Sequence, residues 1–283
     1  MDLHKYFLDQ EAVVVDSKTL FLVLGMHRSG TSAVTRALRT LGIDIGQHTL
    51  ARRDNPRGFF ENPDVVDLNT ALLAKMSCQW DTVRHLPSES FRDLLASDLF
   101  ARASRLIDTL PKDRNTAIKD PRLSRLLPFW RPLVQHKKTT TACIIVVRNP
   151  SAVAASLFVR DRMPEDQAHA LWILYTAEAI LLSAGLPRIL LSYDALMDNP
   201  KQELLRLAHA FSLPLLPDEF RLFQESFLDQ SLRHHTEKTS RRDQAERLYS
   251  ALTPLVHTPD AQGLLTPRIE RELYAALAHA APQ

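Results

Sequence analysis

The chain has 283 residues but only two cysteines, and it lacks any long apolar run. Cys78 and Cys143 lie far apart without C-x-x-C spacing, which argues against a disulfide framework or a zinc site. Both thiols are therefore expected to be free and buried. No run approaches the ~18 apolar residues of a membrane span, and residues 1–17 lack the apolar stretch of a signal peptide. These absences predict a soluble, cytoplasmic protein.

An excess of charge of one sign is also missing. The 35 Lys and Arg residues and the 33 Asp and Glu residues leave a net charge of +2. A dedicated nucleic-acid-binding protein would usually be far more basic, so no nucleic-acid partner is expected. This small net charge does not exclude a local basic pocket.

Glycine is scarce, with seven residues where average usage would give about twenty. Five of the seven lie within the first 58 residues: Gly25, Gly30, Gly42, Gly46 and Gly58. This concentration predicts special backbone conformations in the N-terminal part of the chain.

Short apolar runs alternate with helical patterns along most of the chain. Strands are predicted at 19–24, 116–118, 143–147 and 188–192. Three of these runs are continuously apolar, as expected for strands of a parallel sheet that is covered on both faces. Helices are predicted at roughly 31–42, 64–77, 89–110, 150–160, 165–185 and 198–211. The alternation predicts an α/β fold with a central parallel sheet flanked by helices.

The C-terminal region, from about residue 217, is helical and charged in pattern. Leu248, Leu252 and Val256 recur at i, i+4 and i+8, which indicates an amphipathic helix packed on the body of the protein. We expect residues 1–283 to form one domain, with a helical C-terminal cap on its core.

The segment after the first strand, residues 25–32, reads Gly-Met-His-Arg-Ser-Gly-Thr-Ser. A strand, a glycine-bounded loop and a helix N-terminus together make a cradle for phosphate. The two glycines have Walker A spacing, but Thr31 stands where that motif has lysine, and the loop carries Arg28 instead. Taken alone, the segment also fits a tight turn in which Thr31 or Ser32 is the helix N-cap.

The residues after the other strands matter because ligands of open α/β sheets bind beyond the carboxyl ends of the strands. Arg148 follows the third strand, and Asn149-Pro150 predicts a helix start. Ser156 and Arg160 lie one turn apart on that helix. Arg148, Ser156 and Arg160 could hold a second phosphate, or they could belong to an ordinary strand–helix junction.

Lys119 and Tyr193 end the two remaining strands. Lys119 precedes Asp120-Pro121, which predicts a helix start capped by Asp120. Tyr193 could lie against a nucleobase or belong to the core. Two anion pockets at neighbouring strand ends imply a ligand with two separated phosphate-like groups. ATP fits less well, because the Walker lysine and an aspartate for Mg²⁺ are both missing.

In combination these motifs resemble the sulfotransferase family that uses 3′-phosphoadenosine 5′-phosphosulfate (PAPS), over roughly residues 20–212. Residues 25–32 resemble the 5′-phosphosulfate loop, in the arginine form of tyrosyl-protein and many bacterial sulfotransferases. Residues 146–157, VVRNPSAVAASL, resemble the family's 3′-phosphate motif. Residues 118–122, IKDPR, resemble the segment that supplies a catalytic lysine. Residues 191–200, LSYDALMDNP, resemble the segment near the adenine. The resemblance implies a P-loop NTPase-like α/β fold.

The resemblance also implies roles for individual residues. The 5′-phosphosulfate would be bound by five residues of the loop: Arg28, Ser29, Gly30, Thr31 and Ser32. Arg148 and Ser156 would bind the 3′-phosphate with help from Arg160, and Tyr193 would approach the adenine. Lys119 and Arg28 would neutralise charge on the leaving phosphate, so no metal is expected.

Sulfuryl transfer also needs a base for the acceptor hydroxyl. Glu61 is the candidate, because a glutamate after the phosphosulfate loop serves as base in the tyrosyl-protein branch. Alternatively, Glu61 could be a structural residue that precedes the helix at 64–77 and is favoured there by the helix dipole. His48 and His85 are the alternatives, since cytosolic family members use a histidine. No histidines form an H-E-x-x-H pair, so a zinc site is not expected.

These motifs predict an enzyme that transfers a sulfuryl group from PAPS to an acceptor hydroxyl and releases the bisphosphate PAP. A glycan or another small hydroxyl compound is the expected acceptor. Asp54, Asn55, Arg57 and Trp80 could engage a sugar, although Trp80 could also be core. Two alternatives stay open: a P-loop kinase or NTPase that uses Mg-ATP, and a non-catalytic nucleotide-binding or scaffold protein. The acceptor and the oligomeric state cannot be read from the sequence.

Overall fold

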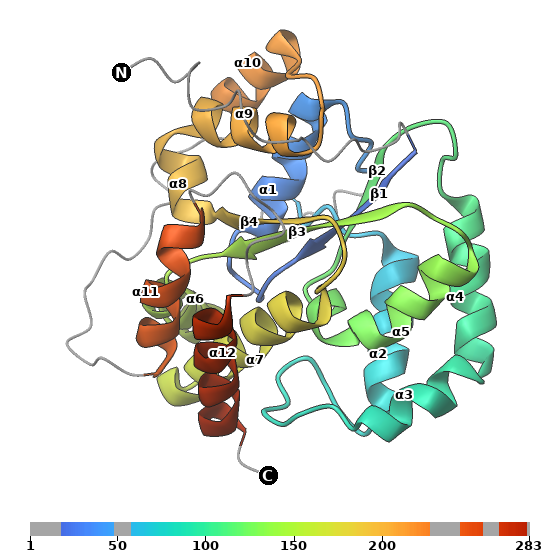
Figure 1. Ribbon diagram of the computed structural model, residues 1–283, viewed down its shortest axis with the longest axis vertical. Coiled ribbons are helices and arrows are strands. Elements are labelled where there is room, and N and C mark those ends of the chain that lie inside the picture. Colours follow the sequence, from blue (N-terminus) through green and yellow to red (C-terminus); the bar gives the residue numbers. More distant parts are fainter. Residues whose placement is uncertain (1–17, 48–57, 227–243, 257–265, 282–283) are drawn as a thin grey trace.

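Four parallel strands form the centre of the computed structural model, which describes residues 18–47, 58–226, 244–256 and 266–281. They are β1 (Leu20–Leu24), β2 (Thr116–Lys119), β3 (Thr141–Val147) and β4 (Arg188–Ser192), in the order β2-β1-β3-β4 (Figure 1). The predicted strands are confirmed, and their ends differ from the predicted ones by at most two residues. The predicted central parallel sheet is confirmed with them.

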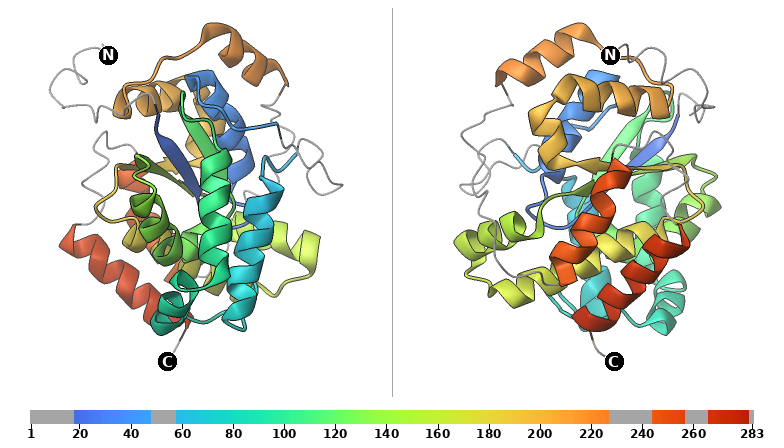
Figure 2. Two further views of the ribbon diagram at one scale, coloured as in Figure 1. Left: turned by 90° about the vertical axis from the view of Figure 1, so that its right-hand side faces the viewer. Right: turned by 60° about the vertical axis from the view of Figure 1, so that its left-hand side comes forward.

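Both faces of the sheet are covered by helices, which explains why the strands read as continuous apolar runs. In β1, Phe21 and Val23 face one cluster of buried side chains, whereas Leu20, Leu22 and Leu24 face the other. The first cluster involves α1 (Thr31–Leu38), α8 (Tyr193–Asp198), α9 (Pro200–Ala210) and α10 (Pro217–Ser226). The second involves α2 (Pro63–Lys75), α3 (Ser88–Leu95), α4 (Asp98–Thr109), α5 (Leu123–His136), α6 (Pro150–Asp161), α7 (Glu165–Leu182), α11 (Gln244–Val256) and α12 (Pro267–Ala280). Figure 2 shows these two layers from the side.

Helix α5 was predicted only by its start at Asp120-Pro121, and its body was not recognised as a helical pattern. It contains Pro128 and Pro132, and prolines inside a helix remove backbone hydrogen bonds and normally argue against one. The predicted helix start at Asp120-Pro121 was too early by two residues. Arg122 N–H donates to Asp120 Oδ1 at 3.0 Å in a turn, and the helix begins at Leu123.

One predicted helix is divided in the structure, and another begins two residues later than predicted. The pattern at 89–110 is interrupted between α3 and α4, where Ser97 caps α4 by accepting a hydrogen bond from Leu99 N–H at 3.3 Å. The pattern at 198–211 begins instead at Pro200, with α8 ahead of it. Capping serines and N-terminal prolines favour new helix starts at these positions.

The order of the strands places a topological switch point beside β1. The chain passes from β1 to β2 on one side, and from β2 across to β3 on the other side of β1. Ligands of open α/β sheets bind at such a point, beyond the carboxyl ends of the strands. The loops after β1 and β3 therefore lie at the position where a ligand is expected.

Other sequence predictions about the core are confirmed. Leu248, Leu252 and Val256 are buried on α11, which packs against α7 and β4. Cys78 and Cys143 are free and buried, and burial raises the pKa of the Cys143 thiol to about 12. Within the described part of the chain, no helix combines the length and apolar character needed to cross a membrane.

Candidate functional site

The loop between β1 and α1 depends on its glycines. Gly25 has φ +143°, and a Cβ there would lie 2.5 Å from the Val146 carbonyl oxygen. Gly30 has φ +85°, and a Cβ there would lie 2.0 Å from the ring of Tyr193. Arg28 also has a positive φ, of 67°. The backbone is thus held in conformations that bring it against the loops at the ends of β3 and β4.

Gly30→Ala is expected to disrupt this loop, because the new methyl group overlaps the Tyr193 ring and the left-handed backbone disfavours alanine. The melting temperature should fall by several degrees, since each kcal/mol lost corresponds to roughly 2–4 °C in a domain of this general size. Calorimetry measures the change. Gly185→Ala is the matched control, because Gly185 also has a positive φ but has open space around its Cβ position. Equal losses in both variants would show that close approach to Tyr193 does not constrain Gly30.

The N-terminus of α1 is left without a side-chain cap. Gly30 is the N-cap residue, so the alternative in which Thr31 or Ser32 caps the helix is wrong. Thr31 is the first residue of α1, and Ser32 Oγ donates instead to the Phe59 carbonyl at 3.3 Å. Ser29 Oγ is buried and, among the described residues, has no hydrogen-bond partner. Uncapped helical N–H groups and an unused buried hydroxyl suit an oxyanion.

The loop after β1 contacts the loop after β3 directly. Arg28 Nε donates to Ser156 Oγ at 2.8 Å, and Arg148 Nη1 donates to the Arg28 carbonyl at 3.1 Å. The Arg148 guanidinium lies over the ring of Tyr193, 4.6 Å from its centroid. These contacts bring together four residues that were predicted from separate motifs: Arg28, Arg148, Ser156 and Tyr193. The sequence predicted two separate anion pockets, whereas the two loops lie next to each other in the structure.

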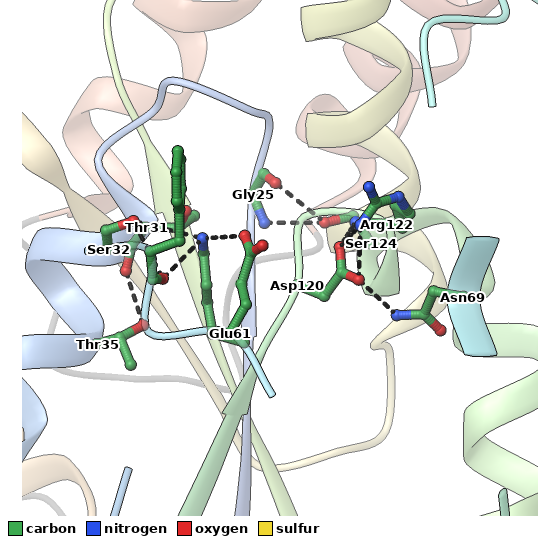
Figure 3. A network of polar contacts seen from close by, with 11 residues as sticks. Gly25, Thr31, Ser32, Thr35, Glu61, Asn69, Asp120, Arg122 and Ser124 are labelled. Carbon is green, nitrogen blue, oxygen red and sulfur yellow. Dashed lines mark hydrogen bonds and ion pairs between the residues drawn. The ribbon is translucent and has the colours of Figure 1, made fainter. Parts of the chain in front are cut away.

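Lys119 and Glu61 form a second group of contacts beside the first helix. Lys119 is 3% exposed, and its Nζ lies 2.6 Å from Glu61 Oε1. Nζ also donates to the Phe59 carbonyl at 3.2 Å and to Ser32 Oγ at 3.4 Å. Lys119 is thus held by its ion pair with Glu61 and by the Phe59 carbonyl, which belongs to the same segment as Glu61. Figure 3 shows Glu61 and Ser32 on one side of Gly25.

Asp120 and Arg122 form a buried network on the other side of Gly25, also drawn in Figure 3. Arg122 Nη1 donates to both carboxylate oxygens of Asp120 at 2.9 Å. Asn69 Nδ2 donates to Asp120 Oδ2 at 3.1 Å, and Ser124 Oγ accepts from Gly25 N–H at 2.8 Å. Asp120 is fully buried, so removal of Arg122 alone would leave its carboxylate charge uncompensated.

His27 is a site residue to which the sequence assigned no role. Its ring lies against Trp80, with centroids 4.5 Å apart, and against Tyr175, with centroids 5.7 Å apart. Burial lowers the pKa of His27 well below its usual range, and Arg122, Arg160, Lys119 and Arg28 lower it further. The imidazole is therefore neutral, and its surroundings are strongly cationic.

Arg160 extends toward Trp80. Its guanidinium carbon lies 5.1 Å from the Trp80 ring centroid, and its Nη2 lies 2.7 Å from Asp161 Oδ2. Trp80 is half-buried and packs against the hydrophobic core. The sequence had left open whether Trp80 is a core residue or engages a sugar. The Trp80 carbonyl accepts a hydrogen bond from Tyr175 OH at 2.7 Å.

The loop that carries Trp80 is fixed by a buried ion pair. Arg125 Nε lies 2.8 Å from Glu178 Oε2, while Arg125 donates to the carbonyls of Thr82 and Arg84. His85, an alternative base, has its Nδ1 3.8 Å from Glu178 Oε1 in this same cluster. Hydrogen bonding to the Glu178 carboxylate raises the pKa of His85, and partial burial opposes this shift.

The remaining sequence candidates near the site were His48, Asp54, Asn55 and Arg57, which lie outside the described residues. Of the missed residues, His27 and Arg122 stand within the quoted motifs, each three residues after the end of a strand. That position was the available signal for both. No group of three or more potential metal-ligating His, Cys, Asp or Glu side chains occurs in the described ranges.

The fold and the site together define a parallel α/β protein with a cationic, glycine-shaped loop at the switch point of its sheet. No family model and no curated protein matches the sequence. Among solved structures, the chain is similar to the "Sulfotransferase Domain from the Curacin Biosynthetic Pathway", with 16% identity and a TM-score of 0.45 over 74% of this chain and 77% of that chain. It is also similar to the "Sulfotransferase Domain from the Synechococcus PCC 7002 Olefin Synthase", with 16% identity and a TM-score of 0.44 over 95% and 98%.

Proposed function

We propose that this protein is a sulfotransferase that transfers a sulfuryl group from PAPS to an acceptor hydroxyl. The observation that carries the proposal is the contact between two motifs far apart in sequence, through Arg28, Ser156 and Arg148, at the switch point of the sheet. The motif resemblance supports PAPS as the donor. Arginine suits phosphate and sulfate groups, because its planar fork can donate two parallel hydrogen bonds.

The residues of the loop after β1 fit the phosphosulfate end of PAPS. Ser29 Oγ is buried without a protein partner in the described residues, and the N-terminus of α1 has no side-chain cap. We assign Arg28 and the Ser29–Ser32 segment to this end of the donor. Arg148 and Ser156 are assigned to the 3′-phosphate, and Tyr193 to the adenine. Arg160 is retained as a helper, although its observed partners are Trp80 and Asp161.

Lys119 and Glu61 are assigned to the transfer itself. When bound, PAPS supplies the sulfuryl group, and the acceptor oxygen forms a bond to sulfur as the bond from sulfur to the bridging oxygen breaks. Glu61 takes the proton of the acceptor hydroxyl, and Lys119 and Arg28 stabilise the negative charge that develops on the leaving phosphate. The 2.6 Å contact between Lys119 Nζ and Glu61 Oε1 supports a shared location for these two roles.

Donor binding separates this proposal from a kinase or NTPase. PAP at about 100 times its dissociation constant should add roughly 2.7 kcal/mol to stability, which corresponds to a melting-temperature rise of about 5–10 °C. Mg-ATP at the same concentration should produce a clearly smaller rise, because the Walker lysine is replaced by Thr31. Differential scanning fluorimetry with both ligands makes the comparison. A larger shift with Mg-ATP would contradict the proposal.

Transfer itself distinguishes an enzyme from a nucleotide-binding scaffold protein. Incubation with ³⁵S-labelled PAPS and panels of glycans, phenols and peptides should label one class of hydroxyl compound, and we propose glycans or small hydroxyl compounds. Labelling should persist in EDTA, because Lys119 and Arg28 supply the positive charge. Binding of PAPS without transfer to any panel member would favour the scaffold protein.

A further inference from the structure

Helix α11 contacts the first residues of α6 and α8, the helices that follow β3 and β4. Ser151 Oγ donates to Glu246 Oε1 at 2.7 Å, and Tyr249 OH donates to Asp194 Oδ2 at 3.3 Å. Glu246 and Tyr249 are three residues apart, so they lie on the same side of α11. This helix was predicted only as a cap on the core, yet its first turns reach the carboxyl edge of the sheet.

Asp194 connects this helix to the start of α6. The same Asp194 Oδ2 accepts a hydrogen bond from Asn149 N–H at 3.4 Å. Asn149 in turn caps α6, because its Oδ1 accepts from Ala152 N–H at 3.0 Å. A chain of hydrogen bonds thus runs from Tyr249 on α11 through Asp194 on α8 to the N-cap of α6.

Tyr249 also supports Arg148 by a second path. The rings of Tyr249 and Trp172 pack edge to face, with centroids 6.2 Å apart and planes at 77°. Trp172 Nε1 donates to the Arg148 carbonyl at 3.0 Å. The guanidinium of Arg148 lies on Tyr193, the residue directly before Asp194. Tyr249 therefore reaches both members of the Arg148–Tyr193 pair through one intermediate residue each.

These hydrogen bonds also involve the negative charges at this edge of the sheet. Asp194 and Glu246 are carboxylates close to a region assigned to a phosphate, and like charges at short range repel. Tyr249 and Ser151 donate to these carboxylates and restrict their orientation. Burial, and then the charge of Asp194, raise the pKa of the Tyr249 hydroxyl, so it remains a protonated donor.

We propose that α11 is part of the nucleotide site and that Tyr249 is a positioning residue that sets selectivity for the 3′-phosphate. The inference rests on the proposed function. Tyr249 acts by holding the N-cap of α6 and the Arg148–Tyr193 pair in place. It is not assigned to any contact with the nucleotide.

The test is the binding of PAP and of AMP, which lacks the 3′-phosphate, to the full chain and its Tyr249→Phe variant. Phenylalanine keeps the ring contact with Trp172 and removes only the hydroxyl. Isothermal titration calorimetry should show PAP binding weakened about tenfold, as expected for the loss of one hydrogen bond to a charged group, with AMP binding changed less than about twofold. Tyr274→Phe, on the exposed side of α12, is the matched control and should change neither affinity.

Each other outcome has a distinct meaning. A wild-type chain that binds no PAP overturns the proposed function and this inference with it. A wild-type chain that binds PAP, with unchanged PAP affinity or equal losses of PAP and AMP affinity in Tyr249→Phe, overturns this inference alone. If Tyr249→Phe does not fold, Ser151→Ala decides in the same assay, because it removes the hydrogen bond from α6 to Glu246 on α11. A PAP-to-AMP affinity ratio that Ser151→Ala leaves unchanged contradicts the inference.

Discussion

Glu61→Gln is expected to lower turnover by a factor of at least about 100, while PAP affinity stays within about twofold of wild type. A general base contributes ~10²–10⁴-fold to rate, and glutamine cannot accept the proton of the acceptor hydroxyl. Glutamine keeps the size of the side chain and an oxygen that can accept from Lys119, which lies 2.6 Å away. The measurement is kcat with PAPS and the acceptor found by labelling, together with a PAP titration.

Asp64→Asn is the matched control, because Asp64 is an exposed carboxylate at the start of α2, close to Glu61 in the chain. It should leave both turnover and PAP affinity unchanged. Near-normal turnover in Glu61→Gln would remove Glu61 from the role of base. His27 would then be the histidine to test first, since its neutral ring lies in the cationic region and His85 is held in the cluster around Glu178.

The strands could be predicted closely because both faces of the sheet are buried. In β1 and β3 every residue is buried, so the apolar runs end where these strands end, at Leu24 and Val147. The helices were harder to predict from local pattern. Pro128 and Pro132 disguised the body of α5, of which only the start was predicted, and the break at Ser97 interrupts a pattern that remains apolar on both sides.

The proximity of Arg28, Arg148 and Tyr193 could be anticipated, because parallel strands end at the same edge of a sheet. The direction of each side chain could not. Arg28 has a left-handed backbone conformation that turns it toward Ser156, and Arg160 extends to Trp80, which lies on another loop. Such contacts depend on the packing of segments far apart in sequence and leave no local pattern. The contacts of α11 belong to the same class.

Arg148→Ala is expected to weaken PAP binding by about 30-fold or more. Truncating one partner of a buried, hydrogen-bonded charge pair costs about 2–5 kcal/mol, and each 1.4 kcal/mol is a factor of ten in affinity. Arg148 also lies over Tyr193 and donates to the Arg28 carbonyl, so its loss removes the link between the two loops as well. Calorimetric titration with PAP and AMP measures the effect, and the loss should be larger for PAP.

Two further variants separate charge from geometry. Arg105→Ala removes an exposed guanidinium from α4 and should leave PAP affinity unchanged, which controls for net charge. Arg148→Lys keeps the charge but lacks the planar group that lies on Tyr193, and it should restore only part of the affinity. Full recovery with lysine would mean that charge alone acts at this position. Unchanged PAP affinity in Arg148→Ala, at an unchanged melting temperature, would exclude Arg148 from the 3′-phosphate site.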